Sequence, residues 1–243
     1  MTDNCIKYAD DIVLVAQITH HTSASMDLLC KTFDSIKQKS NLSCLNLNTS
    51  KSKLIVFPKQ VKHSVNLDII SIPDVPRVSA IKFLGVTFTC DLKWDTHINN
   101  VLKTCNSRLY ALRILRPVFT QDVITQTYQG IILPLLDYAS PVFVSLPAHL
   151  KDKLRSFVKR CHRIIHNWDC NCAKVEDIND RRIRLACKLF KLAEMNCEQS
   201  VHELIPTRLL RTNQFFIEYS ATSRRQRQFQ VFLAILLNRL HIT

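Results

Sequence analysis

The hydrophobic pattern of the chain changes its period near residue 92, and this change constrains the possible folds more than any other feature of the sequence. Before it, short apolar runs alternate with turn-forming residues, which is typical of strands. After it, apolar residues recur every three or four positions over long segments, which is typical of helices. We therefore predict an α+β protein, with antiparallel strands and a packed helix in residues 1–91 and an all-helical part in residues 92–243.

The first part contains several strand patterns. Residues 5–9 and 12–16 are apolar and flank the polar pair Asp10-Asp11, which predicts a hairpin with its tight turn at this pair. Further strands are predicted at residues 54–57, 65–72 and 78–88.

Helices are predicted from capping residues and apolar spacing. Thr22 or Ser23 can cap a first helix that carries Met26, Leu29, Phe33 and Ile36. Asp95 can cap a long helix with Ile98, Val101, Leu102, Cys105, Leu109 and Leu112 on one face. Further helical patterns follow at roughly 121–133, 148–168 and 181–196, separated by prolines.

The composition points to a polyanionic partner. Lys and Arg outnumber Asp and Glu by 33 to 20, a formal net charge of +13. Such an excess favours nucleic acid through phosphate neutralisation, and an anionic membrane surface would satisfy it equally. The two glycines are too few for a Rossmann or P-loop phosphate cradle, so both classes are excluded.

The expected location is intracellular, in the nucleus or cytoplasm. The ten cysteines have no regular spacing, which favours buried thiols in a reducing compartment over a disulfide scaffold. The longest apolar run, residues 231–237, is far below the ~18 to 20 residues needed to span a bilayer. The first residues lack the features of a signal peptide, so we expect a chain that is neither secreted nor membrane-spanning.

The segment Tyr8-Ala9-Asp10-Asp11 carries the clearest chemical signal. Two adjacent carboxylates on a hairpin turn repel each other unless a cation compensates them. In two-metal phosphoryl transfer, carboxylates hold divalent cations that activate the attacking oxygen and shield the leaving one. The alternative is a solvated Asp-Asp turn without a ligand.

Four segments in order are similar to motifs of one enzyme family. Residues 8–16 resemble the third catalytic motif of reverse transcriptases, and residues 45–57, with Lys51, resemble the next palm motif. Residues 83–98 are similar to the primer-gripping hairpin and the start of the thumb, and residues 133–142 to a segment of jockey-like elements. The chain thus resembles the C-terminal part of a reverse transcriptase of a jockey-like non-long-terminal-repeat retrotransposon.

The resemblance implies roles for individual residues. Asp10 would be a Mg²⁺ ligand with Asp11 beside it at the metal site, and Tyr8 would lie under the incoming nucleotide or primer end. Lys51 would neutralise charge near the triphosphate, or it is a solvated lysine that opens a strand. The backbone of Phe83, Leu84 and Gly85 would lie against the primer, although an ordinary strand bulge fits the same glycine. The implied partners are an RNA template with its DNA primer, and deoxynucleoside triphosphates.

The chain also departs from the family pattern. Family members carry a further metal-binding aspartate on a neighbouring palm strand well upstream, and a fingers region before it. Only seven residues precede Tyr8, so we expect this chain alone not to polymerise DNA. Two alternatives remain open: a non-catalytic, basic nucleic-acid-binding module, and a genomic relic without a function.

Basic residues follow one face of each of two predicted helices. The first set is Lys151, Arg155, Lys159, His162, Arg163 and His166, and the second is Arg181, Arg184, Lys188 and Lys191. In a thumb, such faces would follow the phosphates of a primer–template duplex without reading its sequence. The alternative is a plain solvated face.

Metal-capable side chains crowd the end of the first of these helices: Cys161, His162, His166, Cys170 and Cys172. A structural zinc site would use such residues. However, Cys161 falls on the apolar side of the helix, so the competing interpretation is a core cysteine beside solvated histidines.

Overall fold

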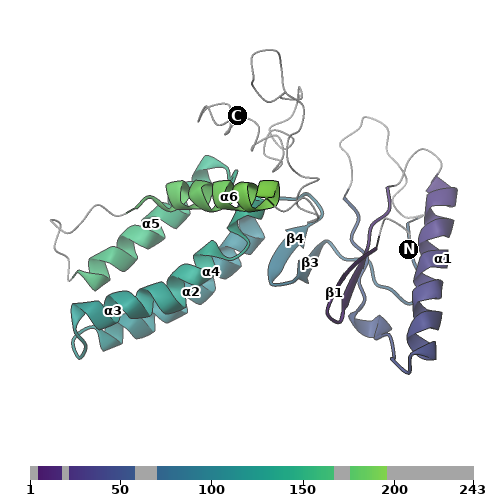
Figure 1. Cartoon of the computed structure of the whole chain (residues 1–243), viewed down its shortest axis with the longest axis horizontal. Coiled ribbons are helices and arrows are strands. Elements are labelled where there is room, and N and C mark those ends of the chain that lie inside the picture. The colour runs from purple at the N-terminus through teal and green to yellow at the C-terminus, as the bar shows by residue number, and fades with distance from the viewer. Residues whose placement is uncertain (1–4, 18–21, 58–69, 167–175, 196–243) are drawn as a thin grey trace, which may run out of the picture. The chain divides into compact units, whose positions relative to one another are not determined.

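The computed structural model describes residues 5–17, 22–57, 70–166 and 176–195, and the chain divides into two compact units, Met1–Lys93 and Trp94–Thr243 (Figure 1). Within the described ranges the fold is a mixture of helices and small antiparallel sheets, as predicted. The division lies beside the change of hydrophobic period near residue 92. Each unit is described below by itself.

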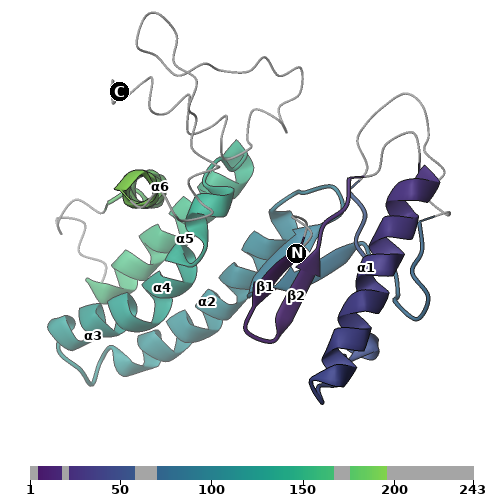
Figure 2. The same ribbon diagram turned by 45° about the vertical axis from the view of Figure 1, so that its right-hand side comes forward.

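The predicted N-terminal hairpin is confirmed, with its turn displaced by one residue. Strands β1 (Cys5–Tyr8) and β2 (Asp11–Leu14) pair antiparallel, with Tyr8 opposite Asp11 (Figure 2). The loop is therefore Ala9-Asp10, and Ala9 adopts a left-handed φ of 49°. A two-residue hairpin loop needs such a backbone conformation, and the sequence pattern alone did not show which residue would take it.

Helix α1 (Thr22–Leu42) confirms the predicted helix. Met26 is buried, and the other apolar residues of the pattern, Leu29, Phe33 and Ile36, are half-buried. The side chains of the predicted caps, Thr22 and Ser23, lie outside the described residues.

The prediction of a strand at residues 54–57 is wrong. Among the described residues, Leu54 makes an isolated bridge with Arg77, through Leu54 N–H to the Pro76 carbonyl (3.0 Å) and Val78 N–H to the Leu54 carbonyl (2.9 Å). A strand needs a continuous partner, which an apolar run by itself does not supply. Most of the strand predicted at residues 65–72 lies outside the described residues, and Ile72 makes an isolated bridge with Val75.

The single strand predicted at residues 78–88 is instead a second hairpin. Strands β3 (Ala80–Phe83) and β4 (Val86–Thr89) pair antiparallel around the loop Leu84-Gly85. Both loop residues have positive φ, 44° for Leu84 and 81° for Gly85, as two-residue hairpin loops of the type I′ class require. The apolar run hides this turn, because Leu84 is an unusual residue for a left-handed position.

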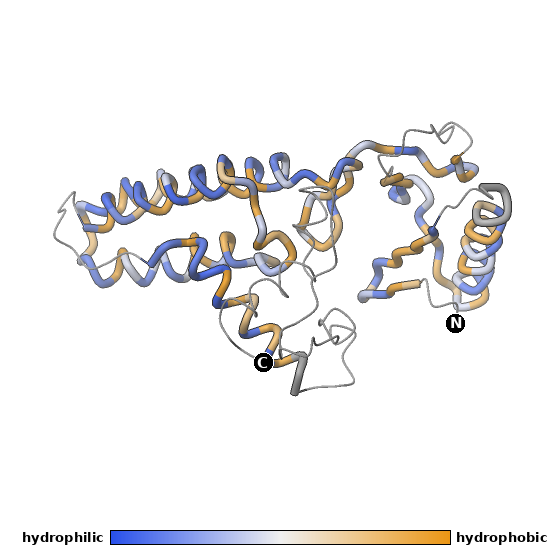
Figure 3. Tube along the Cα trace, turned by 90° about the horizontal axis from the view of Figure 1, so that it is seen from above, coloured by the Kyte–Doolittle hydropathy of each residue, from blue (hydrophilic) through white to orange (hydrophobic). Residues whose placement is uncertain are grey.

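All regular elements in the described residues of the C-terminal unit are helical, as predicted. Its elements are α2 (Asp95–Leu115), α3 (Gln121–Thr127), the π-helical η3 (Tyr128–Ile132), α4 (Leu133–Asp137), the 3₁₀ turn η4 (Ser140–Phe143), α5 (Ala148–Ile165) and α6 (Ile178–Met195). Asp95 is the first helical residue of α2, and Trp94 occupies the capping position assigned to Asp95 from the sequence. Along these helices the hydropathy alternates in the manner of amphipathic segments (Figure 3).

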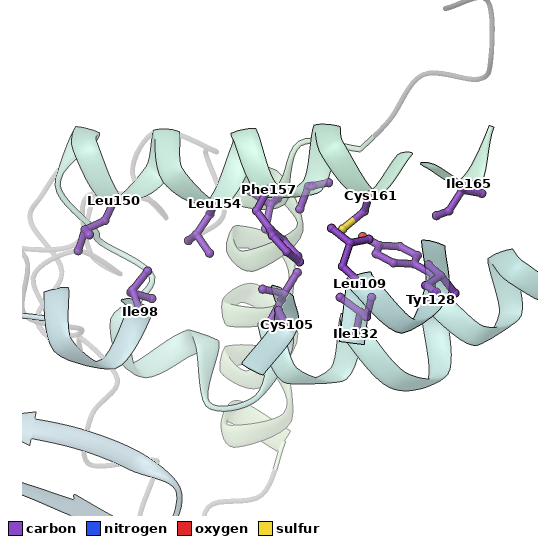
Figure 4. Packing of buried hydrophobic residues seen from close by; sticks show 14 of the residues in the cluster. Ile98, Cys105, Leu109, Tyr128, Ile132, Leu150, Leu154, Phe157, Cys161 and Ile165 are labelled. Carbon is purple, nitrogen blue, oxygen red and sulfur yellow. The ribbon is translucent and has the colours of Figure 1, made fainter. Parts of the chain in front are cut away.

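One apolar core holds this unit together. It runs from Ile98 in α2 to Ile178 in α6 and includes Leu109, Leu154 and Phe157. Figure 4 shows α5 side chains such as Leu150 and Phe157 facing α2 side chains such as Ile98 and Cys105.

Helices α2 and α5 run parallel. Three polar contacts join residues that are always 54 positions apart: Asp95 with His149, Asn99 with Lys153, and Asn106 with Arg160. A constant difference in residue number means that both helices advance in the same direction.

No helix in the described ranges combines the length and the apolar character that a membrane span requires.

Candidate nucleic-acid interface

The β1–β2 hairpin exposes both predicted metal ligands. Asp10 lies in the loop, Asp11 begins β2, and both carboxylates are exposed. Neither makes a salt bridge to any residue that the structure describes. Tyr8, directly opposite Asp11, is also 62% exposed. The hairpin therefore presents two uncompensated carboxylates beside an accessible aromatic ring.

These carboxylates fit Mg²⁺ in the kind of donor that they offer, because hard divalent cations bind carboxylate oxygens. Among the described residues, no group of three or more potential ligands comes together. Within those ranges the hairpin therefore contributes Asp10 and Asp11 as a pair.

Lys51 lies in a helical turn and not directly before a strand. It ends η1 (Thr49–Lys51), and its backbone N–H donates to Asn48 Oδ1 at 3.2 Å, so the Asn48 side chain caps the turn. The Lys51 side chain is exposed. In the described part of the chain, neither a hydrogen bond nor an ion pair connects it to the Asp10-Asp11 hairpin.

The residues expected to contact the primer form the tip of the β3–β4 hairpin. Phe83 ends β3 and is half-buried, while Leu84 and Gly85 form the loop. Gly85 is exposed and has no Cβ, so another backbone could approach it closely.

Three of the predicted phosphate-contacting arginines instead hold carboxylates. Arg181 donates from Nε and Nη2 to both oxygens of Asp137, at 2.6 to 3.0 Å, and these hydrogen bonds are the main cause of its raised pKa. Arg155 Nε donates to Asp177 at 2.6 Å, which likewise raises the Arg155 pKa. Arg184 donates to Glu176 at 2.8 Å. These guanidinium charges are largely matched, so phosphate would have to compete with carboxylate.

These carboxylate partners were not predicted from the sequence. Asp137 is 44 residues from Arg181, and Asp177 is 22 residues from Arg155. A helical projection orders residues around one helix only, so it contains no signal for a partner on another element.

The lysines of the two predicted stripes remain accessible. Lys159, Lys188 and Lys191 are exposed, and Lys151 is half-exposed. In the ranges that the structure covers, none of these four forms a salt bridge. They are the members of the predicted stripes whose charge stays available to a phosphate.

A second basic surface, absent from the prediction, follows the seam of α2 and α5. It is an open groove of about 570 Å³ lined by Leu102, Asn106, His149, Asp152, Lys153, Ser156, Phe157, Arg160 and Arg163. Lys153 Nζ donates to Asn99 Oδ1 at 3.3 Å, and Arg160 Nη2 donates to Asn106 Oδ1 at 2.5 Å. Of the lining residues, only Arg163 was predicted as a phosphate contact, because the groove arises from two helices packed together.

His162 is not the solvated histidine that the sequence suggested. Its ring is half-buried 5.7 Å from the Tyr128 ring, and its Nδ1 has no hydrogen-bond partner among the described residues. Burial, and then the neighbouring His166, hold the pKa of His162 below its ordinary value. The His166 ring lies parallel at 5.9 Å, with its Nδ1 2.8 Å from Gln121 Nε2.

Cys161 is a core residue, as its place on the apolar side predicted. It is fully buried, and desolvation raises the pKa of its thiol to about 12. Such a thiol stays protonated, which suits packing rather than metal binding. The remaining members of the predicted zinc cluster, Cys170 and Cys172, lie outside the described residues.

Arg182 is a buried charge that no sequence pattern indicated. It is 1% exposed, its guanidinium lies 4.7 Å from the centre of the Phe143 ring, and desolvation lowers its pKa to about 10. Its Nε and Nη1 make no hydrogen bond within the described structure. The nearby charge of Asp137 compensates it in part.

Comparison of the chain with known proteins found no relative. No family model matches the chain, and neither the curated proteins nor the solved structures contain a match. The features that bear on function are therefore the chain's own residues: exposed carboxylates on one unit, and a basic groove with accessible lysines on the other.

Proposed function

We propose that this chain is part of an RNA-directed DNA polymerase of a jockey-like non-long-terminal-repeat retrotransposon. Such an enzyme joins deoxynucleotides to a primer along an RNA template. The order of the four motifs in residues 8–142 supports the proposal. The observation that carries it is the pair of exposed carboxylates, Asp10 and Asp11, on the β1–β2 hairpin.

Adjacent carboxylates repel each other, and a divalent cation offsets that repulsion. Asp10 and Asp11 are the residues that would hold Mg²⁺ here. When bound, the cation supplies Lewis acidity to phosphoryl oxygens.

The other predicted residues act through binding and charge. Tyr8 offers an exposed ring beneath a nucleotide or primer end, since it lies opposite Asp11. Lys51 offers an exposed cation that neutralises charge on a triphosphate. The loop Leu84-Gly85 lets the primer backbone approach, because Gly85 has no side chain.

A second candidate function is a non-catalytic nucleic-acid-binding module. The basic groove between α2 and α5 favours it, because Lys153 and Arg160 are paired there with neutral asparagines and, among the described residues, form no salt bridge with a carboxylate. In this alternative the hairpin carboxylates bind no cation. The two candidates therefore differ in what the β1–β2 hairpin does.

A titration with Mn²⁺, a paramagnetic substitute for Mg²⁺, separates the candidates. We expect the amide NMR signals of residues 9–12 to broaden at lower Mn²⁺ than the rest of the chain. The Asp10→Asn/Asp11→Asn variant should lose this effect, while the control Asp27→Asn/Asp34→Asn, on exposed positions of α1, should keep it. Equal broadening at all exposed carboxylates would remove the observation that carries the polymerase proposal and leave the binding module.

Primer extension provides the second test. On a primed RNA template with Mg²⁺ and deoxynucleotides, we expect no extension above background by the chain alone. Any extension that occurs should disappear in Asp10→Ala, because this carboxylate is assigned to the metal. Extension that survives this substitution would overturn the assignment.

A further inference from the structure

The groove between α2 and α5 is built from repeated contacts. His149, Lys153 and Arg160 of α5 each reach an oxygen on α2, from Asp95, Asn99 and Asn106 respectively. The asparagine contacts fix the positions of the charged groups of Lys153 and Arg160 without neutralising them. Arg155, elsewhere on α5, differs because its charge is matched by Asp177 and Asp152.

The spacing of these cations matches a phosphodiester backbone. Lys153 and Arg160 are seven residues apart on one helix, a rise of about 10 Å. Successive phosphates of one stacked strand advance ~3.4 Å along the axis, so this interval corresponds to about three phosphates. Arg163 extends the lining by another helical turn.

An exposed aromatic residue lies on α2 one helical turn beyond Asn106, which lines this groove. Tyr110 is four residues after Asn106 on α2, so it projects from the same side of the helix one turn further on. Its side chain is 67% exposed, which is unusual for so large an aromatic residue. Charged grooves with an accessible ring are the arrangement by which proteins hold single strands, because each unpaired base has a free π-face.

We propose that the α2/α5 groove binds single-stranded nucleic acid, with the backbone on Lys153 and Arg160 and a base stacked on Tyr110. The proposal rests on the nucleic-acid binding put forward above and adds the kind of strand. A duplex could reach the cations, but its bases are already stacked on each other and offer no face to Tyr110. Tyr110 is therefore the residue that distinguishes the two forms.

The test compares single-stranded and duplex oligonucleotides of roughly 12 nucleotides, within the usual site size of single-strand-binding grooves. The full chain is titrated against both probes at several salt concentrations. We expect tighter binding of the single strand. Tyr110→Leu should weaken this binding about tenfold and leave duplex binding unchanged. Tyr110→Phe should retain the wild-type affinity, because it keeps the ring.

The cations are tested with a matched pair of variants. Lys153→Gln/Arg160→Gln should lower the log–log salt slope for the single strand by about 1.4, at ~0.7 per phosphate contact. The control Lys31→Gln/Lys37→Gln removes two exposed lysines from α1, outside the groove lining, and should reduce the slope less. Far-UV circular dichroism checks that each variant remains helical.

The outcomes separate this inference from the proposed function. If duplex binds as tightly as single strand and Tyr110→Leu changes neither, the single-strand site is wrong while nucleic-acid binding stands. If neither probe binds, both are wrong. Binding to anionic lipid vesicles in place of either oligonucleotide would also overturn the proposal.

Discussion

The two units of this chain differ in how much of their apolar surface they bury. In the helical unit, one continuous core joins α2 to α6. In the described residues of the N-terminal unit, the buried apolar side chains are Met26, Ile70 and Val86. Ile6 of the first hairpin is 59% exposed. The comparison shows that an apolar sequence becomes a core only where neighbouring elements cover it, which a two-stranded hairpin cannot do for itself.

The two units also differ in whether their carboxylates are paired with basic side chains. The carboxylates of Asp137 and Asp177 in the helical unit are bound by arginines. The Asp10 and Asp11 carboxylates of the hairpin are exposed and make no salt bridge to a described residue. These paired carboxylates of the helical unit therefore contribute to its stability, whereas those of the hairpin are available for a ligand.

The largest difference between the units should come from core substitutions. Leu154→Ala removes a fully buried side chain from α5 and should lower the free energy of unfolding by about 3 kcal/mol. Ile6→Ala in the hairpin should cost less than about 0.5 kcal/mol, because that side chain is already in water. Urea unfolding followed by circular dichroism measures both. Equal losses would show that Ile6 is covered in solution.

The next effect concerns carboxylates. Asp137→Asn breaks the two-pronged pair with Arg181 and should cost about 2 kcal/mol, since both side chains are mostly buried. Asp10→Asn should cost nothing, because it relieves repulsion with Asp11. Asp152→Asn, whose carboxylate is exposed, is the control within the helical unit and should cost less than about 0.5 kcal/mol. If Asp10→Asn lowered the free energy of unfolding as much as Asp137→Asn, the carboxylate of Asp10 would have to be paired in solution, contrary to the difference described between the units.

A smaller change of opposite sign is expected at Arg182. Arg182→Met keeps the length of a buried side chain and removes its charge. Among the described residues, that charge is stabilised by the Phe143 ring and in part by the charge of Asp137. The free energy of unfolding should rise by about 1 kcal/mol. Arg184→Met, on an exposed position, should change it by less than about 0.5 kcal/mol. A loss of stability in Arg182→Met would mean that the buried guanidinium has a partner in solution.

The smallest effect is a pH dependence of the helical unit. The pKa of His162 lies below 6.5 in the folded chain because of burial and the neighbouring His166. The unfolded state therefore binds a proton first, and stability is lost as the pH falls below about 6.5. His162→Phe should flatten the stability profile between about pH 7 and pH 5. The described residues of the N-terminal unit contain no histidine. A loss of stability of the β1–β2 hairpin over the same pH interval would therefore require another cause.

Much of the secondary structure was predictable from spacing. The amphipathic repeats predicted α1, α2, α5 and α6, and the polar pair between two apolar runs predicted the first hairpin. These predictions succeed because each depends on residues a few positions apart. Cys161 was placed in the core for the same reason, as its side of α5 follows from the helical period.

What the sequence could not provide depends on residues that meet only after folding. The turn at Leu84-Gly85 interrupts an apolar run, and the arrangement of two paired strands decided it. The partners of Arg155 and Arg181 lie 22 and 44 residues away, and the groove forms between residues 54 positions apart. A pattern along one element fixes which side chains share a face. Only packing decides which other face they meet, and so whether an arginine is matched by a carboxylate or left available to a phosphate.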